Sequence, residues 1–190
     1  MNAQWRRCFI ALAPDAASRA ALAKIAAPAA ARVVHPADLH LTLAFLGAIS
    51  AAQGQALSAA LATLAAPVPP LAFTGIAYWP QPARARVMVA TFAPCEALLR
   101  MVRHLRAVLI DLALPVEDRP FRPHVTLARF RPDSRTNGAA GDDAVAAGPE
   151  VAGTAPRAAR FEAMALYASM PAAPGPRYRA LASAALPAGH

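Results

Sequence analysis

The chain has 190 residues, enough to bury a substantial core, and we expect a single domain over residues 1–190. No apolar run approaches the roughly 18 residues of a membrane-spanning helix, so we expect no membrane association. The net charge of +8, carried almost entirely by arginine, favours anionic partners such as phosphates or nucleic acid. The two cysteines, Cys8 and Cys95, have neither disulfide nor metal-ligand spacing, which favours a cytoplasmic location.

The first half of the chain predicts strands and helices in alternation. Asp15 and Ser50 are residue types that begin helices, whereas Pro28 and Gly47 end the elements before them. The expected elements are a strand (5–12), a helix (15–27), a short extended segment (32–35), a strand (40–47) and a helix (50–66).

The second half of the chain predicts strands that follow one another with one helix between them. The expected elements are a hairpin (71–78 and 84–92), a long amphipathic helix (94–114), a strand (124–130), a mobile surface loop (about 131–160) and two final strands (161–169 and 177–184). This order predicts an α+β fold with antiparallel strands rather than a regularly alternating parallel sheet.

Two stretches repeat the same order of residue types: His40–Gly47 reads HLTLAFLG, and His124–Arg129 reads HVTLAR. Side chains alternate between the two faces of a strand, so the histidine and the threonine of each stretch share one face. We therefore expect Leu41, Leu43 and Phe45 on the opposite face, in the core. If the two halves of the chain pack about a shared axis, two histidines and two threonines meet in one cleft.

Such a set of side chains suits phosphoryl transfer. Near neutral pH one imidazole of His40 and His124 can accept a proton while the other donates one. The hydroxyls of Thr42 and Thr126 can hydrogen-bond the non-bridging oxygens of a phosphate, and a strained cyclic diester needs no metal or other cofactor. Two alternatives stay open: each histidine can be a satisfied structural residue, or the pair can bind a metal, although neither motif offers a third ligand.

The stretches HLTLAFLG and FRPHVTLARF resemble the two signature motifs of the two-histidine (2H) phosphoesterases, specifically the LigT-like RNA 2',3'-cyclic phosphodiesterases of the 2'-5' RNA ligase family. The likeness extends to RCFIALAP, FEAMALYAS and RYRALA, and so covers most of the chain. It implies a bilobal fold. Two pseudo-twofold-related lobes with antiparallel sheets would form a central cleft, with the helices on the outside.

The resemblance also implies an activity, which is hydrolysis of an RNA 2',3'-cyclic phosphate end to a 2'-phosphate. Halves of transfer RNA are one source of such RNA ends. Some relatives join 2'-5' RNA ends by the reverse reaction. By motif position His40 and His124 are the catalytic pair, with His40 as the acid and His124 as the base. Thr42 and Thr126 would hold the phosphate.

Arg129 matches an arginine that the LigT-like proteins place near the phosphate. Strict alternation, however, puts Arg129 on the face of Val125 and Leu127, so it reaches the cleft only if the strand bulges or ends near Ala128. The alternative is a solvated arginine at the end of a strand.

Other functions of the same residues stay open. The substrate can be a small nucleotide, such as a cyclic phosphate of ADP-ribose or a 2'-5' oligoadenylate, or the chain can be a non-catalytic module that binds nucleotides or RNA ends, or a purely structural domain. We expect a monomer. Several further residues are weaker candidates. His35, His104 and His190 are expected outside the site. The arginines of the long helix, or Arg84 and Arg86, can contact an RNA backbone, and Phe9, Tyr78 or Trp79 can stack on a base.

Overall fold

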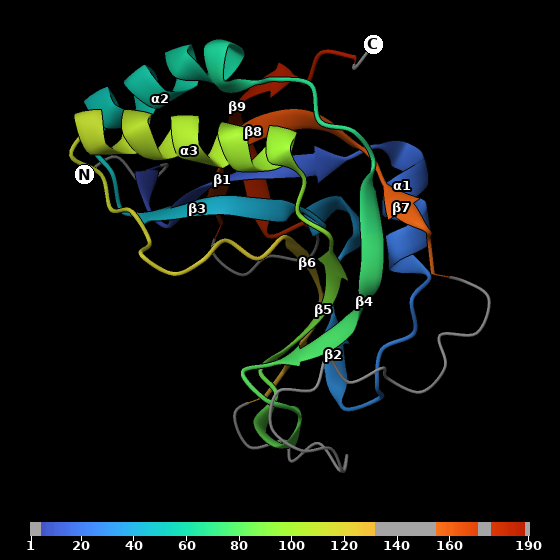
Figure 1. Cartoon of the computed structure of the whole chain (residues 1–190). Helices are drawn as coiled ribbons and strands as arrows, with labels where there is room; N and C mark the ends of the chain where they lie inside the picture. Colours follow the sequence, from blue (N-terminus) through green and yellow to red (C-terminus); the bar gives the residue numbers. More distant parts are fainter. Residues whose placement is uncertain (1–4, 132–154, 171–175, 189–190) are drawn as a thin grey trace.

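The computed structural model describes residues 5–131, 155–170 and 176–188 (Figure 1). Most of the expected mobile loop, residues 132–154, lies outside the described residues. The helices are α1 (Ala16–Ala23), α2 (Ala51–Leu64) and α3 (Glu96–Asp111), with short 3₁₀ helices η2 (Pro36–Asp38) and η3 (Pro82–Arg84). The strands are β1 (Cys8–Pro14), β2 (Ala31–Val33), β3 (Leu41–Gly47), β4 (Leu71–Trp79), β5 (Val87–Phe92), β6 (His124–Phe130), β7 (Ala158–Ala159), β8 (Phe161–Ser169) and β9 (Tyr178–Ala185).

The strands form one continuous antiparallel path in the order β7-β4-β5-β6-β3-β1-β8-β9, and β2 also pairs with β6. The contact between β3 and β6 joins two halves of this path, one made of β1, β3, β8 and β9 and the other of β2 and β4 to β7. In Figure 1, β1 and β3 run across the view while β4 and β5 run downwards, so the sheet bends where the halves meet. The expected α+β class is confirmed.

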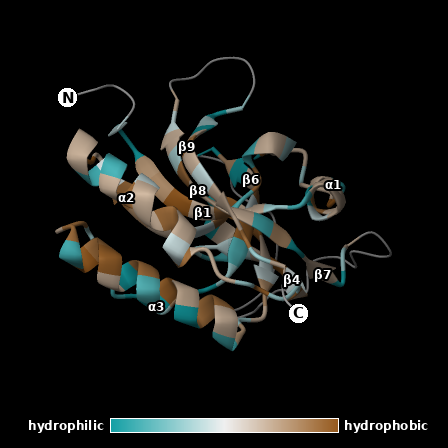
Figure 2. Ribbon diagram, turned by 90° about the horizontal axis from the view of Figure 1, so that it is seen from above, coloured by the Kyte–Doolittle hydropathy of each residue, from teal (hydrophilic) through white to brown (hydrophobic). Residues whose placement is uncertain are grey.

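Two helices cover the half of the sheet that contains β1 and β3, as Figures 1 and 2 show for α2 and α3. The periodicity of α3 predicted its core face, and its buried residues are Leu98, Met101, Val102, Leu105 and Leu109. Brown and teal bands alternate along α3 in Figure 2, as an amphipathic helix requires. None of the described helices is long and apolar enough to cross a membrane.

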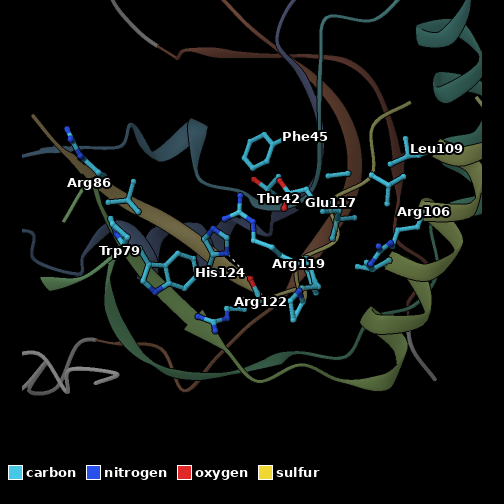
Figure 3. Close-up of a pocket in the computed structure, with 18 residues that line it drawn as sticks. Thr42, Phe45, Trp79, Arg86, Arg106, Leu109, Glu117, Arg119, Arg122 and His124 are labelled. Atoms are coloured by element: carbon cyan, nitrogen blue, oxygen red, sulfur yellow. Dashed lines mark hydrogen bonds between the residues drawn. The ribbon is translucent and has the colours of Figure 1, made fainter. Parts of the chain in front are cut away.

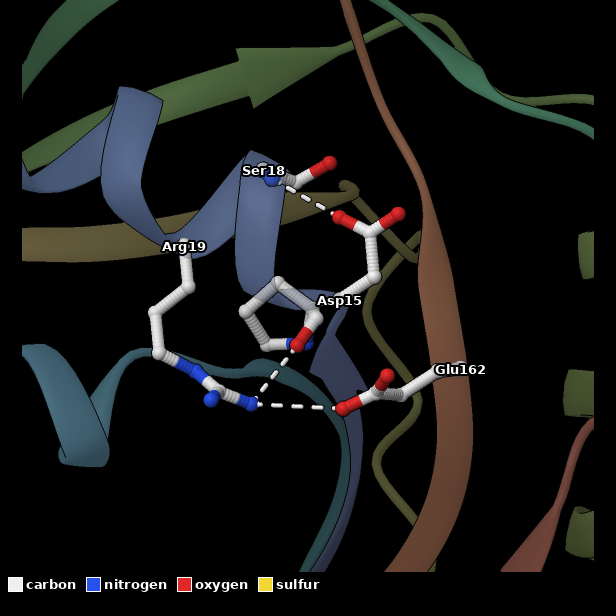
Figure 4. Close-up of polar contacts among 5 residues, drawn as sticks. Asp15, Ser18, Arg19 and Glu162 are labelled. Carbon is white, nitrogen blue, oxygen red and sulfur yellow. Dashed lines mark hydrogen bonds and ion pairs between the residues drawn. The ribbon is translucent and has the colours of Figure 1, made fainter.

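The third helix, α1, is tied to β8 through polar contacts (Figure 4). It begins after Asp15, whose carboxylate accepts a hydrogen bond from the Ser18 backbone N–H at 2.7 Å. Arg19 donates to the carbonyl of Pro14 at 2.7 Å and reaches Glu162 of β8 at 3.5 Å. The helix ends four residues earlier than the sequence predicted.

Three other predictions of element bounds differ from the structure. The second strand of the hairpin begins at Val87 because Pro82–Arg84 form a 3₁₀ turn instead of extended chain. The two-residue strand β7 was missed, since it lies in a segment without periodicity and is held only by pairing with β4. The first strand starts at Cys8 rather than at Trp5.

Candidate active site

The two repeated motifs lie on adjacent strands in the middle of the sheet. β3 and β6 pair through Leu41 and Val125, both of which are fully buried. This register places the histidine of each motif opposite the threonine of the other, on the face away from Leu41 and Val125. His40 and His124 are then diagonal neighbours, which lie about 7–8 Å apart in a regular antiparallel pair. The arrangement has the pseudo-twofold form that the sequence predicted.

The prediction for Phe45 was wrong, because the residue is 57% exposed and does not lie in the core. The pairing of β3 with β1 has two register shifts, which leave Leu43 and Leu46 without a partner in β1. Both leucines stay buried. Beyond the bulge at Leu43, the side chains of β3 alternate between the two faces in the opposite order. Phe45 therefore pairs with Phe9 on the same face as His40, and the rings of Phe9 and Phe45 lie 6.2 Å apart.

A third register shift decides the position of Arg129. In the pairing of β6 with β5, Thr126 lies opposite Val89 and Arg129 opposite Val87, so Leu127 is left over as a bulge. Val87 and Val89 are two residues apart and share one face of β5, so Arg129 shares a face with Thr126. The strand thus has the bulge that Arg129 requires to face the cleft.

Each histidine is held in the same way by its own motif. His40 Nδ1 lies 2.6 Å from the carbonyl oxygen of Asp38, and His124 Nδ1 lies 2.7 Å from the carbonyl oxygen of Arg122. A carbonyl oxygen only accepts hydrogen bonds, so Nδ1 carries the proton in both rings. In the neutral imidazole Nε2 is then the free acceptor. Both rings are prepared to exchange a proton through Nε2.

The surroundings of the two rings lower the pKa of each histidine but in different ways. Burial lowers the pKa of His40, the hydrogen bond to the Asp38 carbonyl raises it in part, and the Arg129 guanidinium lowers it further. Burial also lowers the pKa of His124, but the hydrogen bond to its own carbonyl acceptor and the negative charge of Glu117 act in the opposite direction. The charges of Arg129 and His124 thus lower the pKa of His40 while the charge of Asp38 raises it, whereas the charge of Glu117 raises the pKa of His124.

The threonines of the two motifs differ from the other described threonines. The hydroxyls of Thr63, Thr74 and Thr91 each hydrogen-bond another protein group. Those of Thr42 and Thr126, both half-buried, make no such bond to any residue within the described segments. Unpaired, partly buried hydroxyls that face a cleft suit a ligand rich in acceptor oxygens.

Aromatic rings surround His40. Phe9 lies 4.8 Å from the His40 ring and stacks on Tyr167 at 5.2 Å, while Tyr178 meets His40 edge-on at 5.1 Å. Arg129 donates a long hydrogen bond of 3.5 Å to the Tyr178 hydroxyl. These contacts explain why His40 is half-buried, which no pattern in the sequence reveals.

An open groove with a volume of about 730 Å³ extends from the second histidine toward α3. Its lining includes Thr42, Phe45, Trp79, Arg86, Arg106, Glu117, Arg119, Arg122 and His124 (Figure 3). The Trp79 ring meets the His124 ring edge-on at 4.5 Å. His40 and Thr126 do not line this groove, although the strand register places them beside the residues that do.

The other candidates from the sequence take different positions. His35 accepts a hydrogen bond from the Ala37 N–H at the start of η2, His104 is exposed on α3, and His190 lies outside the described residues. Among the described residues, no three His, Cys, Asp or Glu side chains gather into a group that could hold a metal ion.

Several residues of the site were not predicted from the sequence. Glu117, Arg119 and Arg122 line the groove from the segment between α3 and β6, which has no periodicity to show where its side chains point. Their only signal is that they precede the second motif. Tyr178 is brought to His40 by the last strand of the sheet, far away in the sequence.

Comparison with known proteins agrees with the motifs. The family model "LigT like Phosphoesterase" matches residues 12–89 and 92–178. The chain is 35% identical over 98 residues to the RNA 2',3'-cyclic phosphodiesterase of Bacillus subtilis, covering 50% of this chain and 54% of the relative. It is 35% identical over 103 residues to the enzyme of the same name from Escherichia coli, covering 54% and 57%. The chain thus spans a little over half the length of the curated relatives it matches.

Similarity in structure extends further along the chain. A crystal structure of Escherichia coli LigT complexed with 3'-AMP covers 95% of this chain and 98% of its own, with 28% sequence identity and a TM-score of 0.69. The family model matches well over half of the residues, and the structural similarity to LigT covers nearly the whole chain. The chain therefore belongs to the LigT-like phosphoesterase family.

Proposed function

We propose that this chain hydrolyses the 2',3'-cyclic phosphate at the end of an RNA to a 2'-phosphate, using His40 and His124 and no metal. The observation that carries the proposal is the register of β3 and β6, which sets two Nδ1-anchored histidines and two unpaired threonine hydroxyls on one face. Family membership supports it, as do relatives named RNA 2',3'-cyclic phosphodiesterase. LigT has also been crystallised with 3'-AMP and with phosphate.

The reaction needs one proton to leave the attacking water and another to reach the leaving oxygen. His124 Nε2 takes a proton from water as its oxygen bonds to phosphorus, and the bond from phosphorus to the 3'-oxygen breaks on the opposite side. His40 Nε2–H protonates that 3'-oxygen. The phosphate stays on the 2'-oxygen, and solvent returns the pair to its starting protonation state.

Two of the charges around the pair favour this choice of acid and base. Arg129 lowers the pKa of His40, so His40 gives up its proton more readily, and Glu117 raises the pKa of His124, although the Asp38 carboxylate raises the pKa of His40 as well. The guanidinium of Arg129 and the hydroxyls of Thr42 and Thr126 would hydrogen-bond the non-bridging oxygens of the phosphate. A bound phosphate anion offsets the effect of Arg129 and keeps His40 protonated until the bond breaks.

The pH dependence of kcat/KM tests the paired roles. Catalysis requires one protonated and one neutral histidine, and both have a pKa below the usual 6.5 in the free protein. We expect a bell-shaped profile with its maximum below about pH 6.5, falling at higher pH as the acid loses its proton and at lower pH as the base gains one. A profile that rises to a plateau above pH 8 would contradict the mechanism.

The groove favours a polynucleotide over a small nucleotide. Arg86, Arg106, Arg119 and Arg122 line it with one acidic residue, Glu117, and none of the four arginine side chains forms an ion pair with another described residue. Unpaired guanidinium groups beside an aromatic ring are typical of sites that track a single-stranded backbone. We therefore propose that the nucleotides preceding the cyclic phosphate lie in this groove.

Two arginines on the same helix provide a matched test. Arg106 lines the groove, whereas Arg103 is not among the residues that line it and pairs with Glu96 at 2.7 Å. We expect Arg106→Gln to raise KM about threefold to tenfold for an eight-nucleotide RNA with a cyclic phosphate end. KM for adenosine 2',3'-cyclic phosphate should stay within about twofold, and Arg103→Gln should change neither value. Equal effects of the two variants on KM would show that the RNA does not lie in the groove.

One experiment separates the candidate substrates. The protein is incubated in parallel with an RNA ending in a 2',3'-cyclic phosphate, a 2'-5'-linked oligonucleotide and a cyclic phosphate of ADP-ribose, and products are identified by mass and by sensitivity to phosphatase. We expect fastest turnover of the RNA. Preference for either small molecule would support the alternative phosphodiesterase, and binding without turnover would support a non-catalytic module.

The same site allows the reverse reaction. If the histidines exchange roles, a 5'-hydroxyl can attack the cyclic phosphate in place of water and form a 2'-5' linkage, as microscopic reversibility requires. Bulk water makes hydrolysis the dominant direction in our proposal. We propose that the chain acts as a cytoplasmic monomer, which size-exclusion chromatography with light scattering and fractionation of cells would test.

A further inference from the structure

Asp38 is the most deeply buried charged residue in the described part of the chain, with 3% of its surface exposed. The other buried polar residue there is Ser18. Burying a carboxylate is costly unless its oxygens find partners, and no cationic side chain within the described segments pairs with Asp38. A role that requires a carboxylate at this position accounts for its presence.

The partners of the Asp38 side chain are backbone N–H groups at the start of β9. The Arg177 N–H donates to both oxygens, at 3.0 and 2.8 Å, and the Tyr178 N–H donates to Oδ1 at 3.2 Å. These donors are 139 and 140 residues away in the sequence. Asp38 therefore fixes the beginning of the last strand against η2.

The backbone of Asp38 holds the first histidine. Its carbonyl oxygen accepts the hydrogen bond from His40 Nδ1 at 2.6 Å. In the second motif the equivalent carbonyl belongs to Arg122, whose side chain is exposed. Only in the first motif does the residue that holds the histidine have its own side chain anchored in the protein.

The strand that Asp38 fixes returns to the same histidine. Tyr178 meets the His40 ring edge-on at 5.1 Å and Phe9 at 5.0 Å, and its hydroxyl accepts the hydrogen bond from Arg129. Asp38 thus holds the imidazole of His40 through its backbone carbonyl. Through its carboxylate it holds Tyr178, whose ring contacts that imidazole and whose hydroxyl contacts Arg129.

We propose that Asp38 is a positioning residue for His40, setting both the orientation of the imidazole and the placement of Tyr178 and Arg129 around it. This inference rests on the proposed function only in taking His40 as a catalytic group. Asp38 touches no substrate and acts through its neighbours.

The test compares Asp38→Asn with Ser18→Ala. Ser18 is a matched control because it is also buried, and its hydroxyl also accepts a hydrogen bond from a distant backbone N–H, that of Arg160 at 2.8 Å. Unlike Asp38, Ser18 makes no hydrogen bond to either histidine. Asparagine keeps one acceptor oxygen and turns an N–H₂ toward the donors, so the anchor loosens without a change in size. The readouts are Tm, kcat, KM and nitrogen-15 spectra of the histidine rings recorded against pH.

We expect Asp38→Asn to lower kcat at least about tenfold with KM within about twofold, because proton transfer depends on the orientation of the ring. The preference for the Nδ1–H form of His40 should weaken, and the pKa of His40 should fall because the negative charge of Asp38 raises it. The groups around the ring are Arg129 and His124 on β6, Tyr167 on β8 and Tyr178 on β9. The spectrum of His124 should stay unchanged, and Ser18→Ala should lower Tm alone.

Asp38→Ala removes both acceptor oxygens and should affect kcat and the His40 spectrum more than Asp38→Asn does. Wild-type kcat and an unchanged His40 spectrum in Asp38→Asn would overturn the inference, as would an equal loss of kcat in Ser18→Ala. If the wild-type protein hydrolyses no cyclic phosphate, the proposed function fails, while the His40 spectra still decide whether Asp38 positions the ring.

Discussion

Alanine in place of His40 or of His124 is expected to lower kcat for a 2',3'-cyclic phosphate RNA by about 10²–10⁴-fold, the usual contribution of a general acid or base. Each ring makes one hydrogen bond to a backbone carbonyl, and neither belongs to the apolar core, so both variants should keep the fold. Circular dichroism and Tm check this. His104→Ala, on the exposed face of α3, is the control and should retain full activity.

The two variants should differ when the leaving group needs no proton. A nucleoside 2'-phosphate esterified with 4-nitrophenol releases a weakly basic phenolate, so loss of the acid matters little while loss of the base matters as before. We expect His40→Ala to regain most of its rate on this substrate and His124→Ala to remain inactive. The reverse pattern would exchange the two roles, and full activity of either variant on RNA would rule out the two-histidine mechanism.

Replacement of Arg129 by glutamine should have the second largest effect, a loss of about 10–10³-fold in kcat/KM, the range seen when one charge-stabilising donor is removed. The bulge at Leu127 turns the guanidinium of Arg129 toward His40 and the Tyr178 hydroxyl, where a cation can neutralise the developing charge on phosphate. Because Arg129 lowers the pKa of His40, its removal should also move the falling limb of the pH profile to higher pH.

Arg100→Gln is the control for loss of one positive charge. Arg100 is exposed on α3, lies 3.8 Å from Glu96 and is not among the residues that line the groove. If Arg129→Gln behaved like Arg100→Gln, with an unchanged rate and pH profile, Arg129 would be a solvated residue at the end of a strand. That result would leave the histidines and threonines as the whole of the site.

The sequence predicted the paired histidines and threonines because each motif begins a strand, before any bulge interrupts the alternation of its side chains. Phe45 was misplaced and Arg129 left in doubt for the same reason, which is that a bulge depends on the partner strand. The shifts in β3 arise in pairing with β1, and the shift in β6 arises in pairing with β5. Neither partner can be identified from the motif alone.

The supporting residues of the site were harder to predict. Asp38 is two residues before His40 and resembles any acidic loop residue until β9 covers it. Of the groove arginines, Arg119 and Arg122 come from a segment without periodicity, and only the packing of α3 beside the second motif shows that they share a cavity with Arg106. Alternation and helical periodicity describe single elements, whereas these residues are placed by contacts between elements.

The most direct test of the central claim follows the phosphate itself. The purified protein is treated with excess EDTA and given an RNA that ends in a 2',3'-cyclic phosphate, in water enriched in oxygen-18. We expect undiminished turnover to a 2'-phosphate that contains one atom of oxygen-18, as attack by water with departure of the 3'-oxygen requires. A 3'-phosphate product, or turnover that appears only after a divalent ion is restored, would contradict it.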